Sequence, residues 1–184
     1  IFVHTQDFSE MHTGMVVGHC TANGNGEDCI VQNCLAMGSI SGNMSNTELL
    51  VGGLAGFIGG SDNSALLIES CASYINMGAT LNSVIASFGG VYGSCTALDA
   101  QCTIRNNLNA APVSFTKITS EGNSAVYIGG IGGDSQTVAI ANCVSLTVID
   151  SKLSGKGRKI GPIVGSIHDG TITQCYWNEK TPNT

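Results

Sequence analysis

Short apolar segments recur along the chain at nearly constant intervals, and each of them ends in glycine. They are Met15-Val16-Val17-Gly18, Gly53-Leu54-Ala55-Gly56, Gly90-Val91-Tyr92-Gly93, Gly130-Ile131-Gly132-Gly133 and Pro162-Ile163-Val164-Gly165. The final glycines are separated by 38, 37, 40 and 32 residues. A tight chain corner favours glycine, which has no Cβ and tolerates positive φ. This glycine ladder therefore predicts a corner that repeats five times.

A second ladder follows in each repeat and has nearly the same period. It comprises Val31-Gln32-Asn33-Cys34, Ile68-Glu69-Ser70-Cys71, Ile104-Arg105-Asn106-Asn107, Ile140-Ala141-Asn142-Cys143 and Ile172-Thr173-Gln174-Cys175. Apolar residues alternate here with polar or small ones, which is the period of a strand. The first and last residues of each segment would lie on opposite faces of a regular strand. A bend, a bulge or burial of both faces is therefore needed to bring both inside.

A third apolar segment occurs in most repeats, around Ile40, Leu81, Val113 to Phe115 and Val148-Ile149. One repeat cannot bury its own apolar face, whereas stacked repeats form parallel sheets and a continuous core. The sequence therefore predicts an all-β fold, a right-handed parallel β-helix (β-solenoid) of about five three-strand rungs. At the spacing of parallel strands it would be roughly 20–25 Å tall. The predicted inward row is Val16, Leu54, Val91, Ile131 and Ile163.

The repeats define the expected organisation of the 184-residue chain. Residues 1–13 form a lead-in or edge strand, residues 14–178 form the solenoid, and residues 179–184 form a tail. The repeat boundaries are 14–50, 51–87, 88–127, 128–159 and 160–178. Because residue 1 is Ile, we expect a processed chain or a piece of a longer one. No apolar run is long enough to span a bilayer, so we expect no membrane insertion.

Two stretches resemble the GLUG repeat. One is Val51-Gly52-Gly53-Leu54-Ala55-Gly56 followed by the Ile68–Cys71 segment, and the other joins Ile163-Val164-Gly165 to the Gly170–Asn178 stretch with its Cys-Tyr-Trp ending. The resemblance covers about residues 14–178, with Asn107 in place of Cys in the middle repeat. GLUG-like repeats occur in large secreted or surface proteins of bacteria and protists, including adhesins and some bacterial immunoglobulin A peptidases. The resemblance implies a β-solenoid passenger or stalk and carries no catalytic residues.

The charge is low and unevenly distributed. The chain has 13 acidic and 7 basic residues, and no Lys or Arg precedes Arg105. This distribution lacks the basic footprint that nucleic acid requires. A basic loop precedes the last repeat and contains Lys152, Lys156, Arg158 and Lys159. It is either a solvated insertion or a site for sulfated or sialylated glycan, or for an acidic patch of a neighbouring subunit.

Eight cysteines favour an oxidising, extracellular compartment. Four of them share one position of the second ladder: Cys34, Cys71, Cys143 and Cys175. We predict that they are buried, stacked thiols, since free Cys packs like a small hydrophobe. An inter-rung disulfide such as Cys34–Cys71, or a metal ladder, is the alternative.

The other four cysteines occur as two equivalent pairs. Cys20 and Cys95 lie two residues after ladder glycines, and Cys29 and Cys102 lie two residues before ladder apolar residues. The remaining repeats carry neither member. We therefore predict disulfides Cys20–Cys29 and Cys95–Cys102.

Several side chains have the chemistry of metal ligands. His4, His12 and His19 precede or adjoin Cys20, and His168 lies far along the chain. Their spacing matches no zinc pattern, so we place them in surface loops and predict no metal and no cofactor. The oxygen-rich stretch 23–28 matches no complete EF-hand pattern and is interpreted as a disulfide-closed turn.

The acidic residues Asp62, Glu69, Asp99, Asp134 and Asp169 are scattered, whereas a glycosidase needs paired carboxylates. A carbohydrate-active β-helix enzyme is therefore a minor alternative, and we predict that the chain is not an enzyme. Asn43 begins the only Asn-x-Ser/Thr sequon and would carry glycan in a eukaryotic secreted protein.

Together these features predict a non-catalytic extracellular structural or adhesive module, a scaffold within a cell-surface or secreted protein. A subunit that assembles head to tail into an extracellular filament is the alternative. The expected partners are further copies or flanking domains of the same polypeptide, a glycan, or a host or cell-surface ligand.

Overall fold

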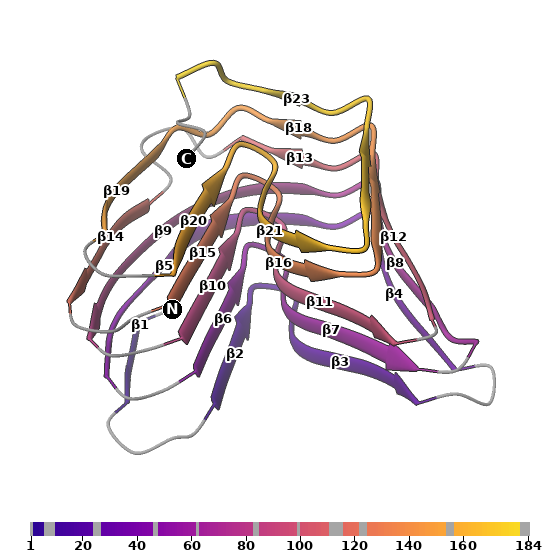
Figure 1. Ribbon diagram of the computed structural model, residues 1–184, viewed down its shortest axis with the longest axis horizontal. Helices are drawn as coiled ribbons and strands as arrows, with labels where there is room; N and C mark the ends of the chain where they lie inside the picture. Colours follow the sequence, from indigo (N-terminus) through magenta and orange to yellow (C-terminus); the bar gives the residue numbers. More distant parts are fainter. Residues whose placement is uncertain are drawn as a thin grey trace.

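A computed structural model describes residues 2–5, 10–23, 27–45, 48–61, 63–82, 85–98, 100–110, 116–121, 125–153 and 157–180. Over these ranges the chain is all-β, without a helix, and its strands form four sheets (Figure 1). The strands within each sheet are parallel. The predicted all-β fold of stacked parallel strands is therefore confirmed.

The four sheets are named A to D. Sheet B contains β2 (Glu10–Gly14), β6 (Glu48–Gly52), β10 (Ile85–Gly89), β15 (Ala125–Gly129) and β20 (Arg158–Gly161). Sheet C contains β3 (Val17–Asn23), β7 (Ala55–Ser61), β11 (Tyr92–Leu98), β16 (Gly132–Gln136) and β21 (Val164–His168). Sheet D contains β4 (Asp28–Gln32), β8 (Ala65–Glu69), β12 (Gln101–Arg105), β17 (Val138–Ala141) and β22 (Thr171–Thr173). Sheet A contains β1 (Phe2–Thr5), β5 (Leu35–Ser45), β9 (Ala72–Asn82), β13 (Leu108–Asn109), β14 (Thr116–Glu121), β18 (Val144–Ser145), β19 (Ile149–Leu153) and β23 (Tyr176–Trp177).

The strand registers are those that the two ladders predict. In sheet D, Ile68 lies between Val31 and Ile104 of the neighbouring strands. In sheet C, Ala55 lies beside Tyr92, one residue before the paired ladder glycines. Residues that are equivalent in the sequence repeat are therefore neighbours in space.

The prediction of three strands per repeat is wrong, because the glycine corner separates two strands. In the second repeat the chain leaves β6 after Gly52 and enters β7 at Ala55. A Cβ on Gly52 would overlap the Ala55 carbonyl oxygen, and one on Gly53 would overlap the Ser73 hydroxyl of sheet A. Among the described glycines only Gly38 and Gly157 have positive φ. Close packing therefore explains the ladder glycines.

The corner between sheets D and A is built differently. In each of the five coils one residue at this corner has positive φ, between 51° and 57°: Asn33, Ser70, Asn106, Asn142 and Gln174. This left-handed residue bends the chain, so that Ile68 and Cys71 are both buried although they are three positions apart. The bend that the spacing required is therefore confirmed.

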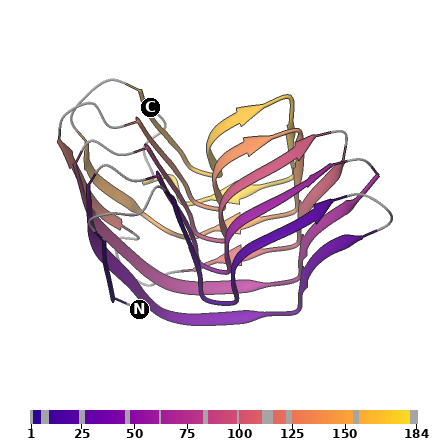
Figure 2. The same cartoon turned by 90° about the horizontal axis from the view of Figure 1, so that it is seen from below.

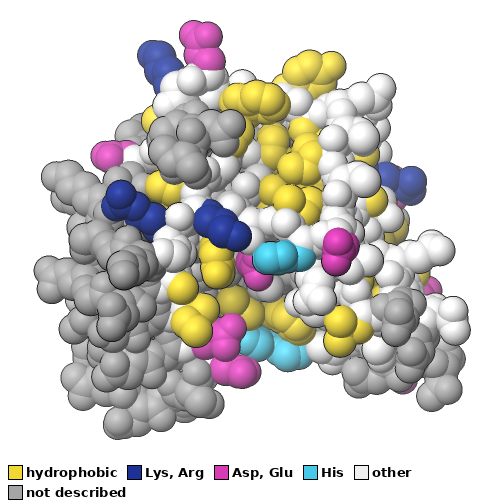
Figure 3. All heavy atoms as spheres, viewed as in Figure 1, with side chains coloured by type: hydrophobic (Ala, Val, Ile, Leu, Met, Phe, Trp, Pro, Cys, Tyr) yellow, Lys and Arg dark blue, Asp and Glu magenta, His cyan; other side chains and the backbone are white. Residues whose placement is uncertain are grey.

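Sheets B and C form two arms that diverge from the glycine corner (Figures 1 and 2), and the surface between them is hollowed (Figure 3). In one arm, Leu49 and Val51 of sheet B lie against Ile40 and Ala79 of sheet A. In the other arm, sheet C packs against sheet D, so that each arm consists of two facing sheets. The first residues of the sheet A strands, such as Ser73 and Asn109, pack against the glycine corner from the side away from the hollow. The hollow is thus lined by the outer faces of sheets B and C.

The predicted inward row is stacked, with one exception. Leu54, Val91, Ile131 and Ile163 are at most 3% exposed, and the Leu54 amide donates to the Val91 carbonyl at 2.9 Å. Val16, the first of the row, is 48% exposed, which corrects its assignment to the core. Among the described strands of sheets B and C, β2 and β3 are the outermost on that side, so Val16 has a neighbour on one side only.

Candidate functional site

The hollow narrows to a line where the two arms meet, which we call the concave corner. Along it, one row of residues in sheet B runs beside a row in sheet C, and corresponding members of the two rows are seven positions apart; side chains of the first pair and of the last pair are in contact. The pairs are His12 and His19, Leu50 and Phe57, Ser87 and Ser94, Tyr127 and Asp134, and Lys159 and Ser166. The strand registers stack these pairs into two facing rows.

The first pair brings two imidazoles into contact. The Nδ1 atoms of His12 and His19 are 2.7 Å apart, and their ring centroids are 4.8 Å apart. The Phe57 ring lies 5.3 Å from the ring of His12 and 5.0 Å from that of His19. Glu10 Oε2 lies 3.8 Å from Nε2 of His12. Histidine and acidic side chains are accordingly visible together in the hollow in Figure 3.

The electrostatics of this end follow from burial and from neighbouring charges. Burial lowers the pKa of His12, and the nearby His19 lowers it further, while Glu10 opposes the shift. Burial raises the pKa of Glu48, and the negative charge of Glu10 adds to that shift. Glu10 and Glu48 are neighbours in sheet B. The first pair therefore lies beside the carboxyl group of Glu10, which in turn neighbours Glu48.

The other end of the concave corner is polar and carries a cation. The Lys159 ammonium donates to the Ser166 hydroxyl at 3.3 Å and lies 5.7 Å above the Tyr127 ring. Ser166 Oγ is 3.5 Å from Nε2 of His168. Asp134 lies beside Ser166, and its Oδ1 is buried without a hydrogen-bond partner among the described residues. The two ends thus differ in charge.

The predicted loop positions of the histidines and basic residues need correction. His12 lies in β2, His19 in β3 and His168 at the end of β21, while Arg158 and Lys159 lie in β20. His4 lies in β1 and Lys152 in β19, and nothing is described of their side chains. Lys156 lies outside the described residues. The sequence concealed the histidine pair because its seven-residue spacing crosses a corner, where strand periodicity gives no signal.

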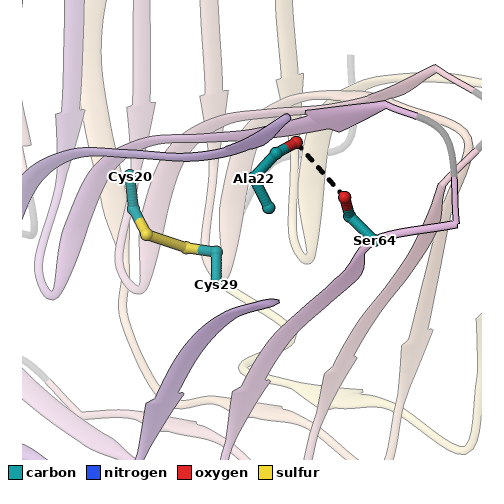
Figure 4. Close-up of a disulfide and its surroundings, with 4 residues drawn as sticks. All are labelled: Cys20, Ala22, Cys29 and Ser64. Carbon is teal, nitrogen blue, oxygen red and sulfur yellow. Dashed lines mark hydrogen bonds between the residues drawn. A yellow bond between two sulfur atoms is a disulfide. The ribbon is translucent and has the colours of Figure 1, made fainter. Parts of the chain in front are cut away.

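The cysteine pairs face each other inside the arm of sheets C and D. Cys20 and Cys29 form a disulfide, with Cα atoms 6.2 Å apart (Figure 4). Nearby, the Ser64 hydroxyl donates to the Ala22 carbonyl at 3.3 Å. In the third repeat, the sulfur atoms of Cys95 and Cys102 are 2.7 Å apart, as thiols. The hydrogen bond with Cys102 and burial raise the pKa of Cys95 well above its usual value.

The four ladder cysteines are thiols, of which Cys71 and Cys143 are buried and Cys34 and Cys175 half-buried. Burial is the main cause that raises the pKa of Cys143 to about 11.

Asn107 occupies the same ladder position as these thiols and is also buried. Its Oδ1 accepts from the Cys71 amide at 3.0 Å, and its Nδ2 donates to the Ile68 carbonyl at 2.9 Å. The amide therefore satisfies two buried backbone groups where the other repeats have sulfur.

The remaining candidate residues are dispersed. Glu69 lies in sheet D and pairs with Arg105 at 2.7 Å, Asp134 lies in sheet C, and Asp169 is at the corner between those sheets. Asp62 and Asp99 lie outside the described residues. Asn43 is exposed in β5. No group of three or more His, Cys, Asp or Glu within the described part of the chain could hold a metal ion. No described helix could cross a membrane.

Comparison with known proteins adds no relative. No family model matches the chain, and no curated protein or solved structure is significantly similar to it. The resemblance to GLUG repeats stays a prediction from the two ladders.

Proposed function

We propose that the chain is a non-catalytic, extracellular structural or adhesive module of a cell-surface or secreted protein. Its scaffold is a right-handed β-solenoid of five coils, since crossovers between parallel strands are almost always right-handed. The Cys20–Cys29 disulfide supports an extracellular location, because structural disulfides persist in oxidising compartments. The resemblance to GLUG repeats points to the same class of protein.

The observation that carries the adhesive role is the apolar outer face of sheet A, opposite the hollow. Two stacked rows form this face: Leu35, Ala72, Leu108, Val144 and Tyr176 in the first row, and Met37, Tyr74, Ala110 and Leu146 in the second. Four members are more than half exposed, namely Leu35 (62%), Met37 (65%), Leu146 (54%) and Tyr176 (68%). None of the nine is charged, although the chain as a whole carries a net charge of −6.

The size of this face supports a role in binding. A large side chain has an area of roughly 200 Å², so the four most exposed members, at the two ends of the rows, together offer on the order of 400–500 Å² of apolar surface. Apolar patches of this size on monomeric proteins are often functional. The absence of charge favours the apolar surface of another protein as the partner.

The proposal is tested by retention on arrays of extracellular proteins and glycans. We compare the unmodified chain with the double variant Met37→Ser and Leu146→Ser. A matched control, Ile30→Ser and Ile85→Ser, removes side chains of similar exposure (50% and 54%) from sheets D and B. Retention that is lost only in the first variant supports the proposal. Equal retention of all three proteins contradicts it.

A second candidate is a subunit that assembles head to tail into an extracellular filament. It is favoured by Ile172 (42% exposed) and Trp177 (52%), which lie on the outermost described strands of sheets D and A. Unpaired strand edges are templates for further strands. Light scattering over a concentration series separates the candidates, because only a filament subunit grows in mass without closing.

A further inference from the structure

The two histidines at the beginning of the concave corner are arranged to share a ligand. Their ring centroids are 4.8 Å apart but their Nδ1 atoms only 2.7 Å apart, so the two nitrogens face each other. A neutral imidazole has one protonated nitrogen and one with a free lone pair. One of the two Nδ1 atoms therefore donates its proton to the other in a hydrogen bond. A metal ion bound by both, at about 2.0–2.1 Å from each, would displace this proton and move the two rings slightly apart.

The surroundings orient the pair for metal binding. Phe57 lies against both rings and limits their rotation. The carboxylate of Glu10, 3.8 Å from Nε2 of His12, favours the tautomer that carries its proton on Nε2. Metal-binding histidines usually carry their other N–H toward a carboxylate or carbonyl, and the charge of Glu10 favours this arrangement although 3.8 Å is longer than a hydrogen bond. This tautomer leaves Nδ1 of His12 free as a ligand.

We propose that His12 and His19 bind a divalent first-row metal ion through their Nδ1 atoms. Imidazole suits Ni²⁺, Cu²⁺ and Zn²⁺, and Cu²⁺ is the tightest of the three in the general order of affinities. Glu10 favours a cation here by its negative charge. His19 is exposed, which leaves a route for the ion. With two protein ligands, water completes the coordination, so the site is open and weaker than a structural zinc site.

This site is independent of the adhesive face, which lies on the opposite side of the molecule. It is tested by calorimetric titration of the folded chain with Ni²⁺ at pH 7.5, since Ni²⁺ binds imidazole and does not oxidise thiols. We expect one equivalent to bind, and we expect His12→Gln and His19→Gln each to weaken binding at least tenfold. The matched controls His4→Gln and His168→Gln should leave the affinity unchanged. Circular dichroism verifies that each variant is folded. Because His19 is exposed, its replacement should leave the core unchanged.

A further variant tests the role of the carboxylate. Glu10→Gln keeps both histidines and should weaken binding by up to about tenfold, because it removes the negative charge beside Nε2 of His12. Binding that survives in both His12→Gln and His19→Gln, or that disappears in His168→Gln, would overturn the proposal. So would the absence of Ni²⁺ binding to the unmodified chain, and an unchanged affinity in Glu10→Gln would overturn the assignment of Nδ1 as the ligand atom.

Discussion

At the glycine corner between sheets B and C, the ladder glycines have no positive φ, and from the second coil onward a Cβ on the final glycine would overlap backbone atoms of the preceding coil. At the corner between sheets D and A, five residues with side chains adopt positive φ, and Ser70 and Asn106 there are exposed. The first corner depends on missing side-chain volume and the second on a backbone conformation. Substitutions at the two corners should therefore change the free energy of unfolding by different amounts and for different reasons.

The largest effect is expected at the glycine corner. A Cβ on Gly93 would overlap the Gly56 carbonyl oxygen and the Val51 amide nitrogen, both of which are backbone atoms that cannot move aside. Gly93→Ala should cost about 3 kcal/mol or more of unfolding free energy, measured by urea denaturation. Gly18→Ala is the matched control, because its nearest neighbour would be the His12 carbonyl oxygen at 3.0 Å. Equal costs at the two positions would contradict the packing explanation.

A somewhat smaller effect is expected at the corner between sheets C and D, which the disulfide closes in the first repeat. Replacing both Cys20 and Cys29 by Ala removes this loop constraint and should cost roughly 2–3 kcal/mol. Urea denaturation of the oxidised proteins measures the loss. Since Ile58 and Leu66 occupy the equivalent positions in the second repeat, a variant with that apolar pair should recover part of the stability.

At the left-handed corner the direction of the effect depends on the substituent. Ser70→Val places a β-branched residue at φ 55° and should destabilise by about 1–2 kcal/mol. Ser70→Gly relieves the same strain and should change stability by less than about 1 kcal/mol, in the favourable direction. Because Ser70 is exposed, neither change alters the core. A shift of the urea midpoint in the same direction for both variants would refute the conformational role.

The smallest effect concerns pH. The folded-state pKa of His12 lies below its ordinary value of 6.5, so the unfolded chain binds this proton more readily. Stability should therefore fall as pH decreases below about 6.5, until the folded-state pKa is passed. Urea midpoints at pH 7.5 and 5.5 measure this dependence, which should be smaller in His12→Gln. A dependence that is unchanged in the variant would show that other groups cause it.

The repeat in the sequence predicted the registers well, because stacking places equivalent residues such as Val31 and Ile68 side by side. It did not reveal the fourth strand of each coil, because the strand that ends at Gly52 and the strand that begins at Ala55 are almost adjacent and look like one apolar segment in the sequence. Nor did it reveal the pairing of His12 with His19, which depends on the angle between two sheets. The exposure of Val16 depends on its place at the edge of the described stack, which periodicity does not encode.

The central claim is that equivalent residues stack in register and that sheets C and D face each other inside one arm. Non-reducing peptide mapping tests it most directly. The arrangement predicts a Cys20–Cys29 disulfide and, because their sulfurs are 2.7 Å apart, a Cys95–Cys102 disulfide in the oxidised protein, with free thiols at the four ladder cysteines. A bond from Cys20 to Cys34 or to Cys95 would contradict both the register and the pairing of the two sheets.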